Sequence, residues 1–124
     1  GVFFINDSYI AAPESVIAAL KALPEVDEEN KKIAVIGEMA ELGQFSEDCH
    51  SNVGKDALDL VDHLICYGKN CAPMAKVWEN ASRPCVHLND HEKVAAYLKT
   101  LVIPGDVVLL KGSNSTKMWT IMDK

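Results

Sequence analysis

Five short apolar segments, separated by longer segments with helical periodicity, most constrain how this chain folds. Each segment is nearly continuously apolar, which is typical of strands buried on both faces of a sheet. Strands and helices alternate along the chain, and this order predicts an α/β fold with a mostly parallel sheet and helices on both faces. The expected strands are Val2–Ile5, Ile33–Ile36, His63–Tyr67, Cys85–Leu88 and Val107–Leu110.

The segments between these strands carry apolar residues at helical spacing. Pro13 suits the first turn of a helix, and Pro24 ends the same helix. Ser46 and Asp90 are expected to be the N-caps of two others, because their side-chain oxygens accept hydrogen bonds from the first turn. The expected helices are Pro13–Leu23, a helix that opens at Ser46 and carries Val53 and Ala57 inward, Asn70–Asn80, Asp90–Leu101 and a short terminal helix at Thr116–Asp123.

Gly54 lies inside the helix that opens at Ser46. Glycine weakens a helix interior by about 1 kcal/mol relative to alanine. Either close packing or a functional need is therefore expected to account for it.

Length and composition limit the class of protein. A chain of 124 residues fits one domain, and no apolar run is long enough to span a bilayer. The net charge of -6 argues against a nucleic-acid surface or an anionic membrane as partner, because both require a basic patch. Lys31 and Lys32 are the only adjacent basic residues, and we expect them to be solvated at the start of a strand.

The cysteines and histidines do not form a recognisable metal motif. Four cysteines occur without a C-x-x-C pair or a secretory signal, which favours reduced thiols in the cytoplasm. The histidines lack the paired spacing of a zinc site, and His63, His87 and His91 are expected to be structural or surface residues. No metal site is expected.

Polar or glycine-rich turns follow three of the expected strands. The first turn contains Asp7-Ser8-Tyr9, the second is Gly37–Gly43, and the third is Lys111–Ser115. The carboxyl ends of parallel strands share one edge of the sheet, where ligands bind in open α/β folds. A carboxylate there accepts hydrogen bonds from sugar hydroxyls or holds a cation, and Lys111 with its polar neighbours suits an anion.

The same residues also have plainer explanations. Asp7 and Ser8 are common turn residues that bond their own backbone. Glu38 and Glu41 are equally compatible with solvated loop acids, and Lys111 with a surface lysine. No phosphate-binding P-loop and no dinucleotide fingerprint occurs, and Ser113 has no base near it in sequence, so nucleophilic catalysis is a poor interpretation.

Several motifs together resemble the C-terminal domain of the Mur ligases, most closely the MurF type. The resemblance covers essentially the whole chain, and the motifs are specific in this order and spacing although each is weak alone. They are Asp7-Ser8-Tyr9 with Ala11 and Pro13, Gly37-Glu38-Met39 with Glu41-Leu42-Gly43, His50, Val53-Gly54 and Gly105–Ser113.

The resemblance implies a single Rossmann-like domain, residues 1–124, which is the third domain of a larger cytoplasmic enzyme. In this family ATP and Mg are bound mainly by a central ATPase domain, which is outside this chain. The family phosphorylates the carboxylate of UDP-MurNAc-tripeptide, and the amine of D-alanyl-D-alanine attacks the acyl phosphate during peptidoglycan precursor synthesis. The domain alone is therefore expected to be inactive and to contain no catalytic residue.

The resemblance also assigns roles by position. Asp7 would reach the ATP ribose, with Ser8 and Tyr9 shaping that side of the cleft. The substrate-binding residues that it implies are Glu38, Glu41, His50, Lys111, Ser113 and Asn114.

The chain departs from the family pattern at three positions. The family usually has asparagines where this chain has Ile10 and Ala12, and aspartate where it has Glu38. Two alternatives stay open. One is a stand-alone Rossmann-like binding module without catalysis, and the other is the same domain of a sister Mur ligase or a folylpolyglutamate synthase.

Overall fold

A computed structural model describes residues 2–6, 13–37, 39 and 43–111 of the chain. Within these residues it contains a single five-stranded sheet in which every strand pair is parallel. The strands are β1 (Phe3–Asn6), β2 (Lys32–Gly37), β3 (His63–Tyr67), β4 (Cys85–Leu88) and β5 (Val107–Lys111). All five expected strands are confirmed to within a residue or two at their ends.

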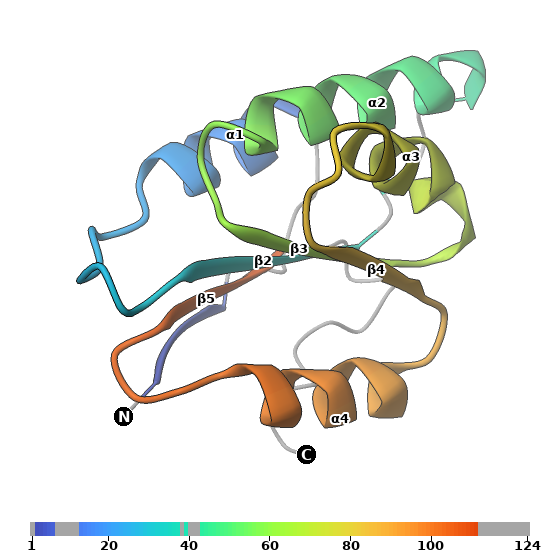
Figure 1. The fold of residues 1–124 in the computed structure, drawn as a ribbon. Coiled ribbons are helices and arrows are strands. Elements are labelled where there is room, and N and C mark those ends of the chain that lie inside the picture. The colour runs from blue at the N-terminus through green and yellow to red at the C-terminus, as the bar shows by residue number, and fades with distance from the viewer. Residues whose placement is uncertain (1, 7–12, 38, 40–42, 112–124) are drawn as a thin grey trace.

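The order of the strands in the sheet is β1-β5-β2-β3-β4, so the last strand lies between the first two (Figure 1). Phe3 pairs with Val107, and Ile36 pairs with Lys111. The chain crosses the sheet in one direction from β1 to β4 and then returns to β5. Because parallel crossovers are right-handed, this reversal puts the last connecting helix on the opposite face of the sheet.

The helices cover the two faces as that rule requires (Figure 1). One apolar core lies between the sheet and three helices, and a second lies on the face covered by the fourth. The first three helices are α1 (Pro13–Lys21), α2 (Ser46–Ala57) and α3 (Ala72–Asn80), and the fourth is α4 (His91–Leu101). Short 3-10 turns precede α2 and α3, at Gly43–Phe45 and Lys69–Cys71. The prediction of an α/β sheet with helices on both faces is confirmed.

The helix starts differ in how they are capped. The Asp90 carboxylate accepts a hydrogen bond from Glu92 N at 2.8 Å, so this cap is confirmed. Ser46 is instead the first residue of α2, and Phe45 precedes it without a side-chain cap. The 3-10 turn at Gly43–Phe45 leads directly into α2 and replaces the expected cap.

The expected terminal helix at Thr116–Asp123 lies outside the described residues. No helix in the described part of the chain has the length and apolar character needed to cross a membrane.

Gly54 lies at a close contact between α2 and α3. A Cβ atom at this position would lie 3.0 Å from the carbonyl oxygen and 3.2 Å from the Cα of Met74. The indole Nε1 of Trp78 also donates a hydrogen bond to Gly54 O at 3.0 Å. Close packing, rather than a ligand, therefore accounts for this glycine.

Replacement of Gly54 by alanine is expected to lower the free energy of unfolding by about 1 to 2 kcal/mol, although alanine is the better helix former. The new methyl group would push the backbone of Met74 away and strain the Trp78 hydrogen bond. Urea unfolding followed by circular dichroism measures the change. A substitution of the exposed Asp56 in the same helix by alanine is the control, and a stabilised Gly54→Ala variant would contradict the packing argument.

Candidate functional site

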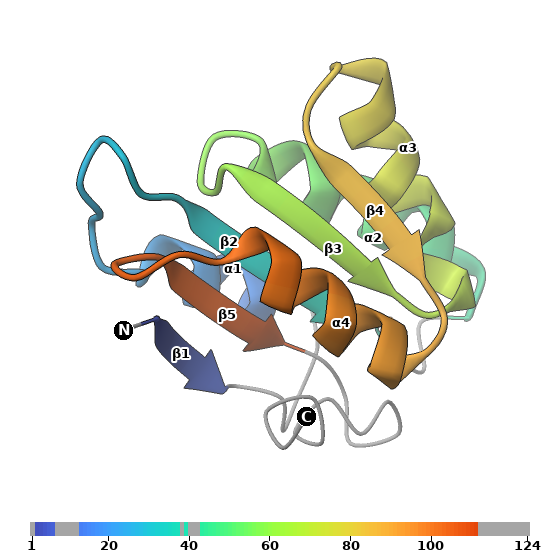
Figure 2. The ribbon, with the colours of Figure 1, turned by 60° about the horizontal axis from the view of Figure 1, so that its bottom comes forward.

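The carboxyl ends of three neighbouring strands form the edge at which the sequence places the candidate site. β1, β5 and β2 are adjacent and parallel, and they end at Asn6, Lys111 and Gly37. In the register of the sheet, Asn6 pairs with Leu110, and Ile36 pairs with Lys111, so the three ends are nearly level. The arrowheads of β1 and β5 point the same way (Figure 2). The three predicted turns therefore start from one edge of the sheet, as expected.

Most of the predicted site residues lie in those turns, outside the described residues. His50 and Lys111 are the two that the structure describes. The roles of the others stay predictions, as do the effects of the departures at Ile10 and Ala12. The residues outside the described part are Asp7, Ser8, Tyr9, Glu38, Glu41, Ser113 and Asn114.

Lys111 is the last residue of β5 and is almost completely buried, with 2% of its surface exposed. It follows Leu109 and Leu110, which are fully buried in the two apolar cores. A surface lysine would leave its ammonium in water, so the plainer explanation of Lys111 is wrong. Burying an ammonium is costly unless it is compensated, and such burial is concentrated at functional sites.

His50 is fully buried in α2 and connects this helix to the chain that leaves β2. Its Nε2 accepts a hydrogen bond from Met39 N at 3.0 Å, and its Nδ1 lies 2.7 Å from Ser46 O. A carbonyl oxygen only accepts hydrogen bonds, so these two partners place the ring proton on Nδ1. From its buried position in α2, His50 therefore holds the backbone just beyond the carboxyl end of β2 in place.

Cys71 also contacts the backbone at the carboxyl end of the sheet. The buried Cys71 thiol lies 3.7 Å from Ile36 O and 3.3 Å from Tyr67 O, which are the carbonyls near the ends of β2 and β3. The Met39 side chain is itself buried in the core. The carboxyl edge therefore rests on a rigid support, which a precise binding site requires.

Replacement of His50 by leucine is expected to lower the free energy of unfolding by about 1 to 3 kcal/mol, because the buried Met39 N–H loses its acceptor. Glutamine retains an acceptor oxygen and is expected to cost less. Thermal unfolding of both variants measures the difference. Nitrogen chemical shifts of the His50 ring provide a separate check, since a proton on Nε2 would contradict the assigned tautomer.

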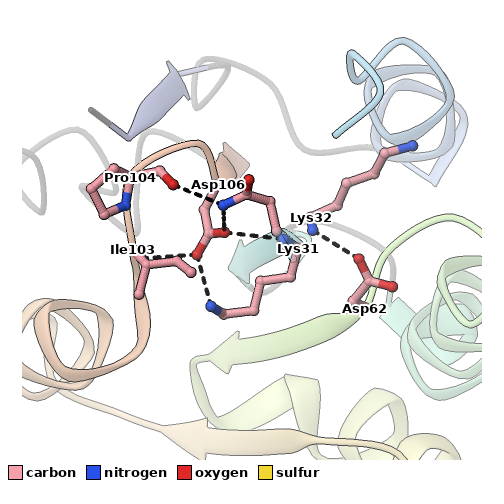
Figure 3. A network of polar contacts seen from close by, with 7 residues as sticks. Lys31, Lys32, Asp62, Ile103, Pro104 and Asp106 are labelled. Atoms are coloured by element: carbon pink, nitrogen blue, oxygen red, sulfur yellow. Dashed lines mark hydrogen bonds and ion pairs between the residues drawn. The ribbon is translucent and has the colours of Figure 1, made fainter. Parts of the chain in front are cut away.

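A second polar network lies at the opposite edge, where β2 and β5 begin (Figure 3). The buried Asp106 carboxylate accepts hydrogen bonds from Lys31 Nζ at 2.7 Å, Asn30 Nδ2 at 2.9 Å, and the backbone N–H groups of Lys31 and Ile103, both at 3.0 Å. Burial by itself would raise the pKa of Asp106, but these donors outweigh it and lower the pKa to about 2.

This network corrects the expectation that Lys31 is merely solvated. Its ammonium forms an ion pair with Asp106, whose side chain is inaccessible to solvent. Lys32 departs from the expectation as well, because its side chain is only 17% exposed, against 25% for Lys31, and its ammonium forms an ion pair with the exposed Glu25. From the sequence, Asp106 was only one residue of the Gly105–Ser113 motif, and it was given no role of its own. Its hydrogen bonds join the residues before β2 to those before β5, which is a structural role.

A hollow of about 360 Å³ lies near this network, away from the carboxyl edge. Several of its polar side chains bind one another or the backbone. Arg83 donates hydrogen bonds to Leu58 O and Val61 O, both at 2.9 Å, and lies over the Trp78 ring. Asp62 accepts from Lys32 N at 2.9 Å. These contacts give Arg83 and Asp62 structural roles.

Two further histidines also have structural partners. His63 Nε2 lies 2.9 Å from the Tyr97 hydroxyl, and His87 Nε2 lies 2.6 Å from Gly68 O, as expected of structural histidines. Burial and the charge of Lys31 lower the pKa of His63. Among the described residues, no cluster of three or more histidine, cysteine or acidic side chains is arranged to hold a metal ion.

Comparison with known proteins relates this architecture to one family. The family described as "Mur ligase, glutamate ligase domain" matches residues 1–114. A relative from Mycobacterium tuberculosis, named UDP-N-acetylmuramoyl-tripeptide--D-alanyl-D-alanine ligase, is 32% identical over 99% of this chain. A relative of the same name from Escherichia coli is 34% identical over 92% of the chain. The chain spans only 28% and 25% of the lengths of these two relatives.

Solved structures give the same result. The MurF ligase from Thermotoga maritima, in complex with ADP, has a TM-score of 0.80 and 29% identity, and the match covers 99% of this chain and 27% of that one. A MurF structure from Acinetobacter baumannii has a TM-score of 0.81 and 25% identity, covering 98% of this chain and 27% of that one. Both are similar in fold and sequence to nearly the whole length of this chain.

Proposed function

This chain belongs to the Mur ligase family, as a C-terminal domain, and from that premise we propose that it is part of a MurF-type ligase of peptidoglycan precursor synthesis. The full protein joins D-alanyl-D-alanine to UDP-MurNAc-tripeptide in the cytoplasm, using ATP and Mg. This domain supplies one side of the cleft, and the remaining domains precede it in the same polypeptide.

One observation carries the proposal. Relatives that share the name of the D-alanyl-D-alanine ligase match nearly the whole chain at 30 to 34% identity. The matched region therefore spans the carboxyl edge of the sheet as well as the apolar core. A nucleotide role is supported by the ADP that the Thermotoga maritima structure holds.

The proposed chemistry divides between the domains. ATP converts the tripeptide carboxylate to an acyl phosphate, with release of ADP. The amine of D-alanyl-D-alanine then attacks the acyl carbon, so that phosphate leaves and an amide forms. Mg and the triphosphate are held by the central ATPase domain, while Asp7, with Ser8 and Tyr9, contacts the ribose from this side.

The edge of the sheet is suited to holding the second substrate. Lys111 brings a buried positive charge to the end of β5, and D-alanyl-D-alanine carries a carboxylate. Ser113 and Asn114 follow it in the chain, and Glu38 and Glu41 flank Met39, whose backbone His50 holds. We propose that these residues position the dipeptide for attack, since orientation is a large part of catalysis for a two-substrate reaction.

The full-length protein provides the test. Purified protein, MgATP and UDP-MurNAc-tripeptide are expected to release phosphate when D-alanyl-D-alanine is added, with the amide product identified by mass spectrometry. Addition of a single amino acid to a shorter UDP-MurNAc precursor would identify a sister Mur ligase, and glutamate addition to a folate would identify a folylpolyglutamate synthase. Either result would overturn the proposal.

The domain alone is proposed to be inactive, because the other side of the cleft is on the preceding domains. Isothermal titration of residues 1–124 with ATP or D-alanyl-D-alanine is expected to show weak binding or none. Submicromolar affinity for ATP would instead support a stand-alone binding module. A start codon directly upstream of Gly1 in the reading frame would support the same alternative.

A further inference from the structure

Two cysteines are neighbours on the half of the sheet away from β1 and β5. Cys66 is in β3, and Cys85 is in β4, the outer strand beside it (Figure 2). In the register of this strand pair, Leu64 lies opposite Cys85, and Cys66 lies opposite His87. Cys66 is therefore the diagonal neighbour of Cys85. Both side chains pack in the apolar core beneath α1, α2 and α3, so they project from the same face of the sheet.

The two thiols interact with each other but differ in their exposure to solvent. The hydrogen bond between the two side chains, followed by burial, raises the pKa of the Cys66 thiol. The same hydrogen bond lowers the pKa of Cys85, although burial and the charge of Glu79 oppose it. Cys66 is fully buried, whereas Cys85 is half-buried. Because oxidants react with accessible thiolates, Cys85 is the more susceptible of the two.

We propose that Cys66 and Cys85 are a redox-sensitive pair, which hydrogen peroxide converts to a reversible disulfide between β3 and β4. The Cys85 thiolate attacks one oxygen of the peroxide and the O–O bond breaks, which leaves a sulfenic acid on Cys85 and a hydroxide. The proton that the Cys85 thiol gave up converts this hydroxide to water. The Cys66 sulfur then attacks the sulfenic sulfur, so that an S–S bond forms and the S–O bond breaks. The Cys66 proton leaves with the hydroxyl group as a second water, and two electrons pass from the thiols to the peroxide.

The neighbouring thiol decides what becomes of an oxidised Cys85. A sulfenic acid that meets no thiol is oxidised further to a sulfinic acid, and that step is irreversible. Cys66 is already in contact with Cys85, so it captures the sulfenic acid within the same molecule. Cys71 is a third buried thiol near Cys66, but its Sγ lies within reach of the carbonyl oxygens of Ile36 and Tyr67 and is held there.

The disulfide is expected to be easily reduced. Diagonal neighbours in a sheet have Cα atoms roughly 7 to 8 Å apart, whereas a disulfide usually requires less than about 7 Å. β4 must therefore shift toward β3 as the bond forms. It is an outer strand that pairs only with β3 in the described part of the chain, so it shifts more easily than a central strand. Strained disulfides have more oxidising reduction potentials, which is typical of reversible rather than structural bonds.

Peroxide treatment of the full-length protein, followed by blocking of free thiols and peptide mass spectrometry, tests the proposal. The expected product links the peptide that contains Cys66 to the peptide that contains Cys85, and reduced glutathione is expected to cleave it. In Cys66→Ala, sulfinic acid on Cys85 is expected to rise about tenfold over the wild-type protein, because no thiol captures the sulfenic acid. The proposal would be overturned by a missing Cys66–Cys85 link, by a link from Cys66 to Cys71, by a link that glutathione leaves intact, or by equal sulfinic acid in the two proteins.

Cys49→Ala is the matched control, since Cys49 is also half-buried against the same core but belongs to α2. We expect it to leave the yield of the Cys66–Cys85 link unchanged, and loss of the link in this variant would contradict the pairing. The map of the wild-type protein does not require either variant to fold, so it tests the pair by itself. None of these measurements uses ATP or a peptide substrate, and their outcome is therefore independent of the proposed function.

Discussion

Replacement of Asp106 by alanine is expected to lower the free energy of unfolding by about 3 kcal/mol, the largest effect on stability that the described residues lead us to expect. The variant removes the carboxylate that accepts hydrogen bonds from four donor groups. Lys31 loses its ion pair, and the N–H groups of Lys31 and Ile103 lose their acceptor in a partly buried site. The start of β2 and the start of β5 are then no longer held together.

Urea unfolding at pH 7 measures the loss, and Asp62→Ala is the matched control. Asp62 also accepts a hydrogen bond from the start of β2, at Lys32 N, but its side chain is exposed. We expect the control to cost less than about 1 kcal/mol, because water replaces the lost acceptor. Equal losses for the two variants would show that burial of Asp106 contributes nothing.

The network also predicts how stability depends on pH. The pKa of Asp106 is lowered from 3.8 to about 2 in the folded protein, so folding favours the ionised carboxylate. Its contribution is therefore complete above the unfolded pKa near 4 and is lost as the pH falls toward 2. The shift corresponds to about 2 kcal/mol. In Asp106→Asn the decline of stability between pH 4 and pH 2 is expected to be shallower by that amount, and an unchanged decline would contradict the assignment.

Replacement of Lys111 by methionine in the full-length protein is expected to lower kcat/KM for D-alanyl-D-alanine by about 30- to 1000-fold, or 2 to 4 kcal/mol. Methionine has a similar length without the charge, so the variant removes the proposed partner of the dipeptide carboxylate. Lys111 is buried at the end of β5, and a charge interaction there is screened less by water than one at the surface.

Rates of phosphate release with saturating ATP and tripeptide measure the effect, after correction for the folded fraction of each variant. Lys99→Met is the control, because Lys99 is exposed in the last turn of α4 and its charge is solvated. We expect its kcat/KM to equal that of the wild-type protein. If the corrected kcat/KM of Lys111→Met equals that of the wild-type protein, its lower activity is explained by loss of folded protein. Lys111 would then have a structural role and would not belong to the substrate site.

The sequence predicted the fold well for local reasons. Continuous apolar segments identified all five strands, and Asp90 identified the start of α4. The expected cap at Ser46 was wrong, because the 3-10 turn before it determines how α2 begins. The shared edge for the three turns was also predicted, since the direction of parallel strands follows from the alternation of strands and helices.

The candidate site was predictable only in part. Its location followed from strand ends, but the contacts that support it did not. His50 was expected to form a wall of the site, and the structure shows that it holds Met39 N from within the core. Its role in substrate binding stays a prediction. The structure is compatible with that role, because His50 holds Met39, which lies in the predicted turn after β2. Lys31 was expected to be solvated, because nothing near it in sequence suggested a buried carboxylate.

By itself the sequence determined which segments are strands, which are helices, and that the sheet is parallel. The spacing of apolar residues and the turn residues that indicate these features each involve only a few neighbouring positions. Only the tertiary structure decided that β5 inserts between β1 and β2, and that Asp106 meets Lys31 across 75 positions of sequence. It alone also exposed the aromatic rings of β1. Such features depend on which distant segments become neighbours, and this is set by the packing of the whole chain.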